Sequence, residues 1–345
     1  MRNPIGADRL LPLQRFWVCL GGMDHIEFAI ALDGASRGTQ LKDEAEIIAR
    51  LKADDLAWVH LHADHEVTPG WMAEHLTFVE PPTRKALTAE VTRPRAFAVD
   101  DGLMVILRGM NLNPGSEPED MVSLRLFLNP ARIISLSRRP LKSVTELREQ
   151  IAVSRGPETP GAFLANLVDR LGTRIDDAVM QLADQVDDLE EEVIAAPRPD
   201  HRAKVVSHRQ EVIDLRRYLA PQRDALAWLA HVGHPVLTKA DRRRLAEAHD
   251  RLVRVVEELE SMRDALVVLR DEIEAVVQEK LNRNLYLLSI LSAIFLPLGF
   301  LTGLMGINLG GMPGAEGRWA FWVFTFLLAL VAGLQLWILR RLKWI

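Results

Sequence analysis

Two long uncharged stretches near the C-terminal end constrain the fold of this chain more than any other feature. They cover residues 285–305 and 320–339, and only Glu316 and Arg318 carry charge in the Gly-rich segment between them. About 20 apolar residues in a helix span the hydrocarbon core of a bilayer. The sequence therefore predicts two transmembrane helices that follow a large soluble part.

Positive charges flank this pair of stretches and indicate its orientation. Lys280 and Arg283 precede the first stretch, and Arg340, Arg341 and Lys343 follow the second. Because Lys and Arg concentrate on the cytoplasmic side, we expect both termini in the cytoplasm and the linking loop outside. The N-terminal residues lack the apolar segment of a secretory signal. We therefore predict a multi-pass protein of the inner (plasma) membrane.

The composition argues against several classes of function. The formal net charge of −5 over 345 residues is unlike that of a nucleic-acid binder. One cysteine, Cys19, excludes an intramolecular disulfide and a zinc site built from several thiolates. A Walker A loop and a nucleophile elbow are absent from the sequence. We expect neither an enzyme nor a tightly bound cofactor.

Residues 1–160 alternate strand and helix signals and predict a cytoplasmic α/β domain. Strands are expected at residues 15–20, 27–32, 57–61, 103–108, 122–128 and 132–136, and helices at 42–53, 69–79 and 141–153. Residues 161–284 predict a bundle of long helices, a cytoplasmic stalk, with helices at 163–196 and 201–232. A third helix begins near residue 239 and meets no Pro or Gly before Pro297, so it can continue into the membrane domain, residues 285–345.

The third helix carries an apolar seam whose spacing alternates between three and four residues. Its members are Leu245, Ala248, Leu252, Val255, Leu259, Met262, Leu266, Leu269, Ile273 and Val276. This heptad pattern predicts close packing against other helices. The partner helices lie either in the same subunit or in a neighbouring one, and the sequence leaves both open.

The first span has a narrow face of small and polar residues that continues the heptad spacing. It consists of Asn282, Leu285, Ser289, Ser292, Leu296, Gly299 and Gly303. Such a face serves either tight helix packing or the wall of a water-filled path. We predict the path, with Leu285 and Leu296 as apolar constrictions, inside a closed ring of several copies. The second span reads as uniformly apolar over residues 321–339 and is expected to face lipid.

Seven-residue steps back from Leu285 reach Gln278, Asp271, Asp264, Glu257 and Asp250. In a ring, this acidic line would raise the cation concentration at the inner mouth of the path. Asp271 and Asp264 are the residues that we expect to act in this way. The alternative is a solvated face of the stalk, because a straight helix drifts about 20° per heptad.

The end of the first span, Leu301-Thr-Gly-Leu-Met-Gly-Ile-Asn-Leu-Gly-Gly-Met-Pro-Gly314, resembles the CorA superfamily of divalent-cation transporters. Ile307 and Gly314 stand where magnesium-type members have Met and an acidic residue, so the closer resemblance is to the ZntB-type zinc-transporter branch. Further matching blocks are Trp58–Leu61, Thr92–Arg95, Leu107–Asn111 and Arg125.

The resemblance implies a homopentamer with a central pore and an entrance motif at Gly306, Ile307 and Asn308. The Asn308 amide oxygen would hold a hydrated dication without binding it too tightly for release. Zinc is the implied ion, with Mg²⁺, Co²⁺, Ni²⁺ and Cd²⁺ as further candidates, and proton coupling stays open. The alternatives are a magnesium or cobalt channel of the CorA type and a membrane-anchored sensor or scaffold.

Three histidines, His60, His62 and His65, suggest a metal site, but their spacing supplies no fourth ligand. His60 lies in a predicted strand, where a structural role is favoured. The sequence therefore assigns no resident metal site.

Overall fold

The computed structural model describes residues 23–53, 55–307 and 317–342. The chain divides into two compact units. One contains Met1–Glu192 and Ala203–Val268, and the other contains Val193–Arg202 and Leu269–Ile345. The strand predicted at 15–20 and Asn308 of the entrance motif both lie outside the described residues.

In the described part of the chain, the first unit is built on a mixed sheet of six strands in the order β1-β2-β6-β5-β4-β3. The strands are β1 Ile26–Ala31, β2 Ala57–His62, β3 Arg95–Val99, β4 Gly102–Gly109, β5 Val122–Leu128 and β6 Arg132–Ser137. Only the β2–β6 pair is parallel, and each of the other neighbouring pairs is antiparallel. The α/β class predicted for this part is confirmed.

Two elements of this domain, β3 and α3, were not predicted from the sequence. Strand β3 is short and half-exposed at the sheet edge, so its residues do not alternate between an apolar and a polar face. Helix α3, Pro81–Thr88, starts with two prolines. Proline is tolerated in the first helical turn because the N–H groups there have no intrahelical partner.

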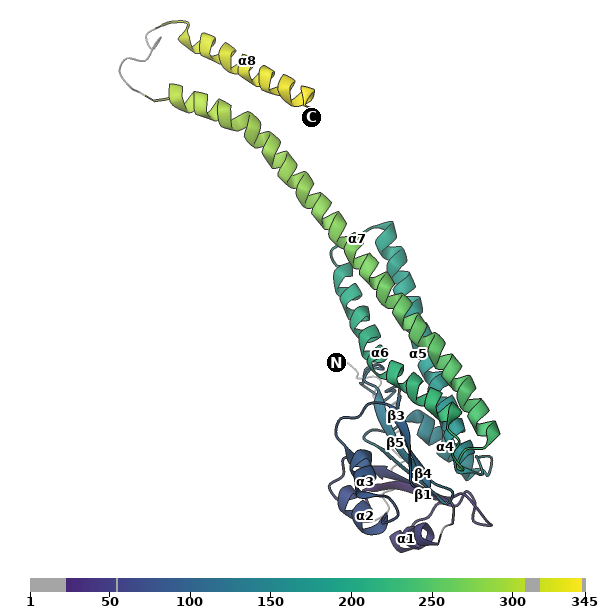
Figure 1. Ribbon diagram of the computed structural model, residues 1–345. Coiled ribbons are helices and arrows are strands. Elements are labelled where there is room, and N and C mark those ends of the chain that lie inside the picture. Colours follow the sequence, from purple (N-terminus) through teal and green to yellow (C-terminus); the bar gives the residue numbers. More distant parts are fainter. Residues whose placement is uncertain (1–22, 54, 308–316, 343–345) are drawn as a thin grey trace, which may run out of the picture. The chain divides into compact units, whose positions relative to one another are not determined.

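Helices cover both faces of the sheet (Figure 1). Helices α1 (Glu44–Lys52), α2 (Thr68–His75) and α3 bury one apolar core against it. On the other face lie α4 (Lys142–Ala152) and α5 (Pro160–Ala195). Aromatic contacts join the helices to this second face. The ring centroids of Trp58 (β2) and Phe163 (α5) are 4.7 Å apart, and the guanidinium carbon of Arg148 (α4) lies 5.0 Å from the centroid of the Phe28 ring.

Helix α5 packs beside α6 (His201–His231) and the first part of α7 (Lys239–Met305) (Figure 1). The heptad seam of α7 is buried from Leu245 to Ile273, and Val276 is half-buried. The seam is therefore a packing face within one subunit over that length. The 67 residues of α7 form one continuous helix, about 100 Å long at 1.5 Å per residue.

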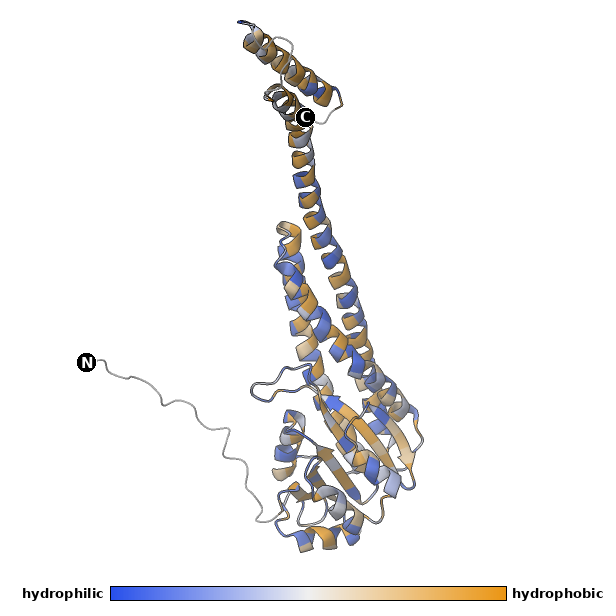
Figure 2. Cartoon of the chain, turned by 90° about the vertical axis from the view of Figure 1, so that its left-hand side faces the viewer, coloured by the Kyte–Doolittle hydropathy of each residue, from blue (hydrophilic) through white to orange (hydrophobic). Residues whose placement is uncertain are grey.

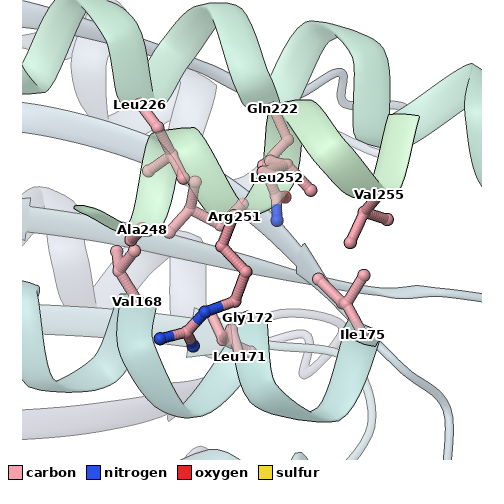
Figure 3. Close-up of a pocket in the computed structure, with 11 residues that line it drawn as sticks. Val168, Leu171, Gly172, Ile175, Gln222, Leu226, Ala248, Arg251, Leu252 and Val255 are labelled. Atoms are coloured by element: carbon pink, nitrogen blue, oxygen red, sulfur yellow. The ribbon is translucent and has the colours of Figure 1, made fainter. Parts of the chain in front are cut away.

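A junction between the bundle and the sheet forms around Gln222 of α6 (Figure 3). Its side-chain oxygen accepts the Arg108 backbone N–H at 2.6 Å, and its amide nitrogen donates to the Arg108 carbonyl at 3.2 Å. The cavity beside it holds about 10 Å³, room for about one water molecule. Arg251 of α7 closes its side with an ion pair to Asp169, 3.2 Å long. This is a packing junction and not a ligand site.

Candidate ion pathway

The end of α7 and the whole of α8 (Ala320–Arg341) form the two predicted spans. Each contains an 18-residue window of mean hydropathy 2.1, of which 0% and 6% respectively is buried within the chain. Figure 2 shows both segments as predominantly hydrophobic. Apolar surface of this extent is not stable in water, so lipid or further protein must cover it.

The two spans touch along one face of each helix. On α7 the half-buried positions are Ile290, Ile294, Pro297, Leu298 and Leu301. On α8 the corresponding half-buried positions are Ala320, Phe324, Leu328, Val331, Ala332 and Gln335, and Leu339 is buried. The three- and four-residue steps are those of one helix face.

The predicted pathway residues occupy the opposite side of α7. Asn282, Leu285, Ser289, Ser292, Leu296, Gly299 and Gly303 are all exposed in the single chain. At about 100° per residue, their mean direction is roughly opposite that of the positions half-buried against α8. The structure therefore brings this set onto one face, which α8 leaves uncovered in the single chain.

Two hydroxyl groups on or beside this face, those of Ser289 and Thr302, already have a partner for their hydrogen. Ser289 Oγ donates to the Leu285 carbonyl at 2.9 Å, and Thr302 Oγ1 donates to the Leu298 carbonyl at 3.0 Å. A hydroxyl oxygen that donates in this way keeps its lone pairs free. It can therefore accept hydrogen bonds from the water shell of a passing cation.

The entrance motif directly follows the last residue of α7. The Gly306 N–H donates to the carbonyls of Thr302 and Gly303, at 2.9 and 3.1 Å, and so closes the final turn. Ile307 is 46% exposed. Asn308 is beyond the described part, so its role as an entrance ligand stays a prediction.

The second span was predicted to be uniformly apolar and to face lipid, but its Gln335 makes a polar contact with the first span. Pro297 lacks an N–H, so it cannot bond the Ala293 carbonyl four residues earlier in α7. The Gln335 side-chain nitrogen donates to that carbonyl at 3.3 Å. The sequence signal for this contact was a single amide within an apolar span, together with a proline in the other span.

The acidic line of α7 is solvent-exposed in the single chain, but it is not purely acidic, and its role at the inner mouth stays a prediction. The side chains of Asp264 and Asp271 are 69% and 59% exposed. Each carboxylate is bound by the preceding arginine, with closest contacts of 2.8 Å from Arg263 and 2.7 Å from Arg270. These hydrogen bonds raise the pKa of both arginines. The field of each pair is therefore weaker than that of an isolated carboxylate.

His60 has a structural environment. It is buried, its ring nitrogens lie 2.7 Å from Ser135 Oγ and 3.2 Å from Ser137 Oγ, and its Nε2 is 3.4 Å from a Glu27 carboxylate oxygen. Burial, with smaller effects from His62 and Arg148, lowers the pKa of His60 to about 3. The described residues contain no group of three or more His, Cys, Asp or Glu able to hold a metal ion.

Comparison with known proteins gives consistent matches over nearly the whole chain. The family model for the CorA-like Mg²⁺ transporter protein matches residues 53–341. The divalent cation transporter CmaX of Pseudomonas aeruginosa is 38% identical over 322 residues, covering 92% of this chain and 96% of that protein. The zinc transport protein ZntB of Pectobacterium carotovorum is 33% identical over 317 residues, covering 92% and 95%.

The similarity extends to a solved structure. The full-length CmaX protein superposes with a TM-score of 0.78 at 37% identity, over 93% of this chain and 98% of that one. The predicted fold, an α/β domain followed by long helices and two C-terminal apolar helices, is thereby confirmed.

Proposed function

The chain belongs to the CorA-like Mg²⁺ transporter family, and from that premise we propose that it carries zinc across the inner membrane through a ring of identical copies. The family consists of ion transporters, so the chain is not an enzyme. Divalent cations are its transported substrates and are not resident cofactors.

The free face of α7 is the observation that carries this proposal. It contains small and hydroxylated residues, including Ser289, Ser292, Gly299 and Gly303, in a span that otherwise suits lipid. A polar face in hydrocarbon is unfavourable unless it meets protein or water. Since α8 packs on the other side of α7, a ring of α7 helices places this face around a central path. The resemblance supports five copies.

Zinc is favoured by the relatives and by the end of the first span. The ZntB relatives are named for zinc transport, and each match covers 92% of this chain. Ile307 and Gly314 also depart from the magnesium-type pattern. The family description favours magnesium as the second candidate. The flanking Lys280 and Arg283, with Arg340 and Arg341, support cytoplasmic termini.

Ion flux into liposomes tests the proposal. The purified full-length protein is reconstituted, and entry of Zn²⁺ and Mg²⁺ is followed in parallel with ion-specific dyes. We expect saturable entry of both ions, with zinc the faster. Preference for magnesium would overturn the zinc assignment, and the entry of neither ion would indicate an anchored sensor or scaffold.

A matched pair of glycines links flux to the proposed face. A Cβ at Gly303 of α7 or at Gly333 of α8 would meet no atom within 4 Å in the single chain. Gly303→Val narrows the proposed path and should abolish most flux. Gly333→Val places the same side chain on α8 outside the path and should leave flux near the wild-type level.

A further inference from the structure

Four arginines gather around a cavity within the first unit. The cavity has a volume of about 300 Å³ and lies between strands β4 to β6 and helix α6. Arg108, Arg125, Arg138 and Arg139 line it, together with Tyr218. The volume lies at the lower end of the range of about 300–1,000 Å³ for small-molecule sites. The proposed transport function does not use this cavity.

Arg125 of β5 is the buried centre of the cluster. Its side chain is 1% exposed, and one terminal nitrogen donates to the Ala89 carbonyl at 2.9 Å. The other terminal nitrogen and Nε are buried without a hydrogen-bond partner. Burial, then the neighbouring Arg138 and Arg108, lowers the pKa of Arg125 to about 10. A buried charge with unused donors is costly unless an anion compensates it.

Arg108 of β4 is held in a fixed position beside Arg125. Its two terminal nitrogens donate to the carbonyls of Met121 and Thr92, at 2.7 and 2.8 Å. Its guanidinium group lies 4.3 Å from the centre of the Tyr218 ring. Its Nε is also buried without a partner. The two guanidinium groups are therefore preorganised, and each keeps at least one donor free.

Acidic side chains do not neutralise this cluster. Arg138 pairs with Asp64 at 2.7 Å, which leaves the other three arginines without a carboxylate partner among the described residues. The two acidic residues that line the cavity, Glu90 and Asp120, are both solvent-exposed and form no ion pair in the described part of the chain. The cavity is thus a site with excess positive charge.

We propose that this cavity binds a phosphomonoester group. The planar guanidinium fork matches the oxygens of phosphate, and several forks around one cavity favour a dianion over a single carboxylate. The cavity also has room for a small organic group attached to the phosphate. Inorganic phosphate is not an ester, but it shares with a nucleoside monophosphate a phosphate dianion that the guanidinium groups can bind, and the experiment separates these two sources.

Isothermal titration of the purified full-length protein tests the site, with inorganic phosphate and adenosine monophosphate as probes. Chloride at equal ionic strength is the control. We expect both phosphates to bind and chloride to give no saturable signal. If adenosine monophosphate binds more tightly than inorganic phosphate, the cavity also contacts the nucleoside. If the two affinities are equal, the cavity recognises the phosphate group alone.

Two substitutions place the binding in this cavity. Arg125→Met should abolish binding, and Arg139→Gln, at an exposed residue of the rim, should weaken it by about three- to tenfold. Arg95→Gln changes an exposed arginine of β3 that does not line the cavity and should bind as the wild type does. If Arg125→Met does not fold, the phosphate affinity of Arg139→Gln tests the proposal in its place. No phosphate binding by the wild type, or equal binding by Arg139→Gln and the wild type, would overturn the proposal.

Discussion

The side-chain amide of Gln335 donates a hydrogen bond to the backbone carbonyl of Ala293, at 3.3 Å. Pro297 makes this carbonyl available because its ring nitrogen has no hydrogen to donate. In hydrocarbon an unpaired carbonyl is costly. The proline in the first span and the glutamine in the second therefore form one device, which satisfies the backbone and joins the two helices.

A double-mutant cycle tests this device. Gln335→Leu should destabilise the detergent-solubilised protein by about 0.6–2 kcal/mol, the usual range for a hydrogen bond between membrane helices. In a Pro297→Ala background residue 297 can bond Ala293 itself, so the cost of Gln335→Leu should fall by more than half. Additive effects of the two changes in denaturant titrations would show that the contact and the proline are independent.

The half-buried carboxyl group of Glu27, beside the buried His60, predicts a specific pH dependence of stability. Burial raises the pKa of Glu27 from 4.5 to about 7, against a smaller opposing effect of Arg148. The folded state therefore favours protonated Glu27, and this stabilisation is present below about pH 4.5 and lost as the pH rises through 7. Glu27→Gln stays neutral, so its stability relative to the wild type should rise by up to about 2 kcal/mol between pH 5 and 7.5.

Denaturant unfolding of both proteins at pH 5 and pH 7.5 measures this difference. Glu46→Gln, at an exposed glutamate of α1, is the control, because it measures the effect of a Glu-to-Gln change at a solvated position. A stability difference between Glu27→Gln and the wild type that is constant over this pH range would contradict the assignment.

The charges along α7 predict opposite effects for two adjacent residues. Asp271→Asn leaves Arg270 without the carboxylate that binds it at 2.7 Å, so zinc flux should fall, by about two- to fivefold at low salt. Arg270→Gln frees the carboxylate and should raise flux under the same conditions. Both effects should shrink at high salt, because the Debye length falls to about 3 Å at 1 M. Flux that is insensitive to both changes at every salt concentration would mark a merely solvated face.

The entrance motif gives a prediction for Asn308. Asn308→Ala removes the amide oxygen that we expect to meet the hydrated ion, so flux should fall at least tenfold while assembly stays normal. Size-exclusion chromatography checks the assembly, and liposome flux checks the transport. Normal flux through a normally assembled variant would reject this role for Asn308.

Periodicity made much of this architecture predictable. The heptad seam from Leu245 to Ile273 is buried as its spacing indicates, and the uncharged lengths located both membrane helices. The strands that are buried on both faces were found because they are runs of apolar residues. The edge strand β3 and the proline-initiated α3 were missed, since neither carries a strong periodic signal.

Contacts between residues far apart in the sequence were not predictable in the same way. Arg125 lies on β5 and Arg138 directly follows β6, and both meet Arg108 and Tyr218 only after the sheet and α6 have packed. The pairing of Gln335 with Ala293 depends on how the two spans align. The pairing of Asp271 with Arg270 is local, but it depends on side-chain rotamers that a helical pattern does not specify.

The central claim is that the free face of α7 lines the ion path, and thiol modification during zinc flux tests it most directly. Single cysteines are introduced by Ser292→Cys and Gly299→Cys on that face, and by Val323→Cys and Leu330→Cys on the exposed side of α8, all in a Cys19→Ser background. A charged, water-soluble thiol reagent should block flux through the two α7 variants and leave both α8 variants active. Block of the α8 variants with full activity of the α7 variants would contradict the account.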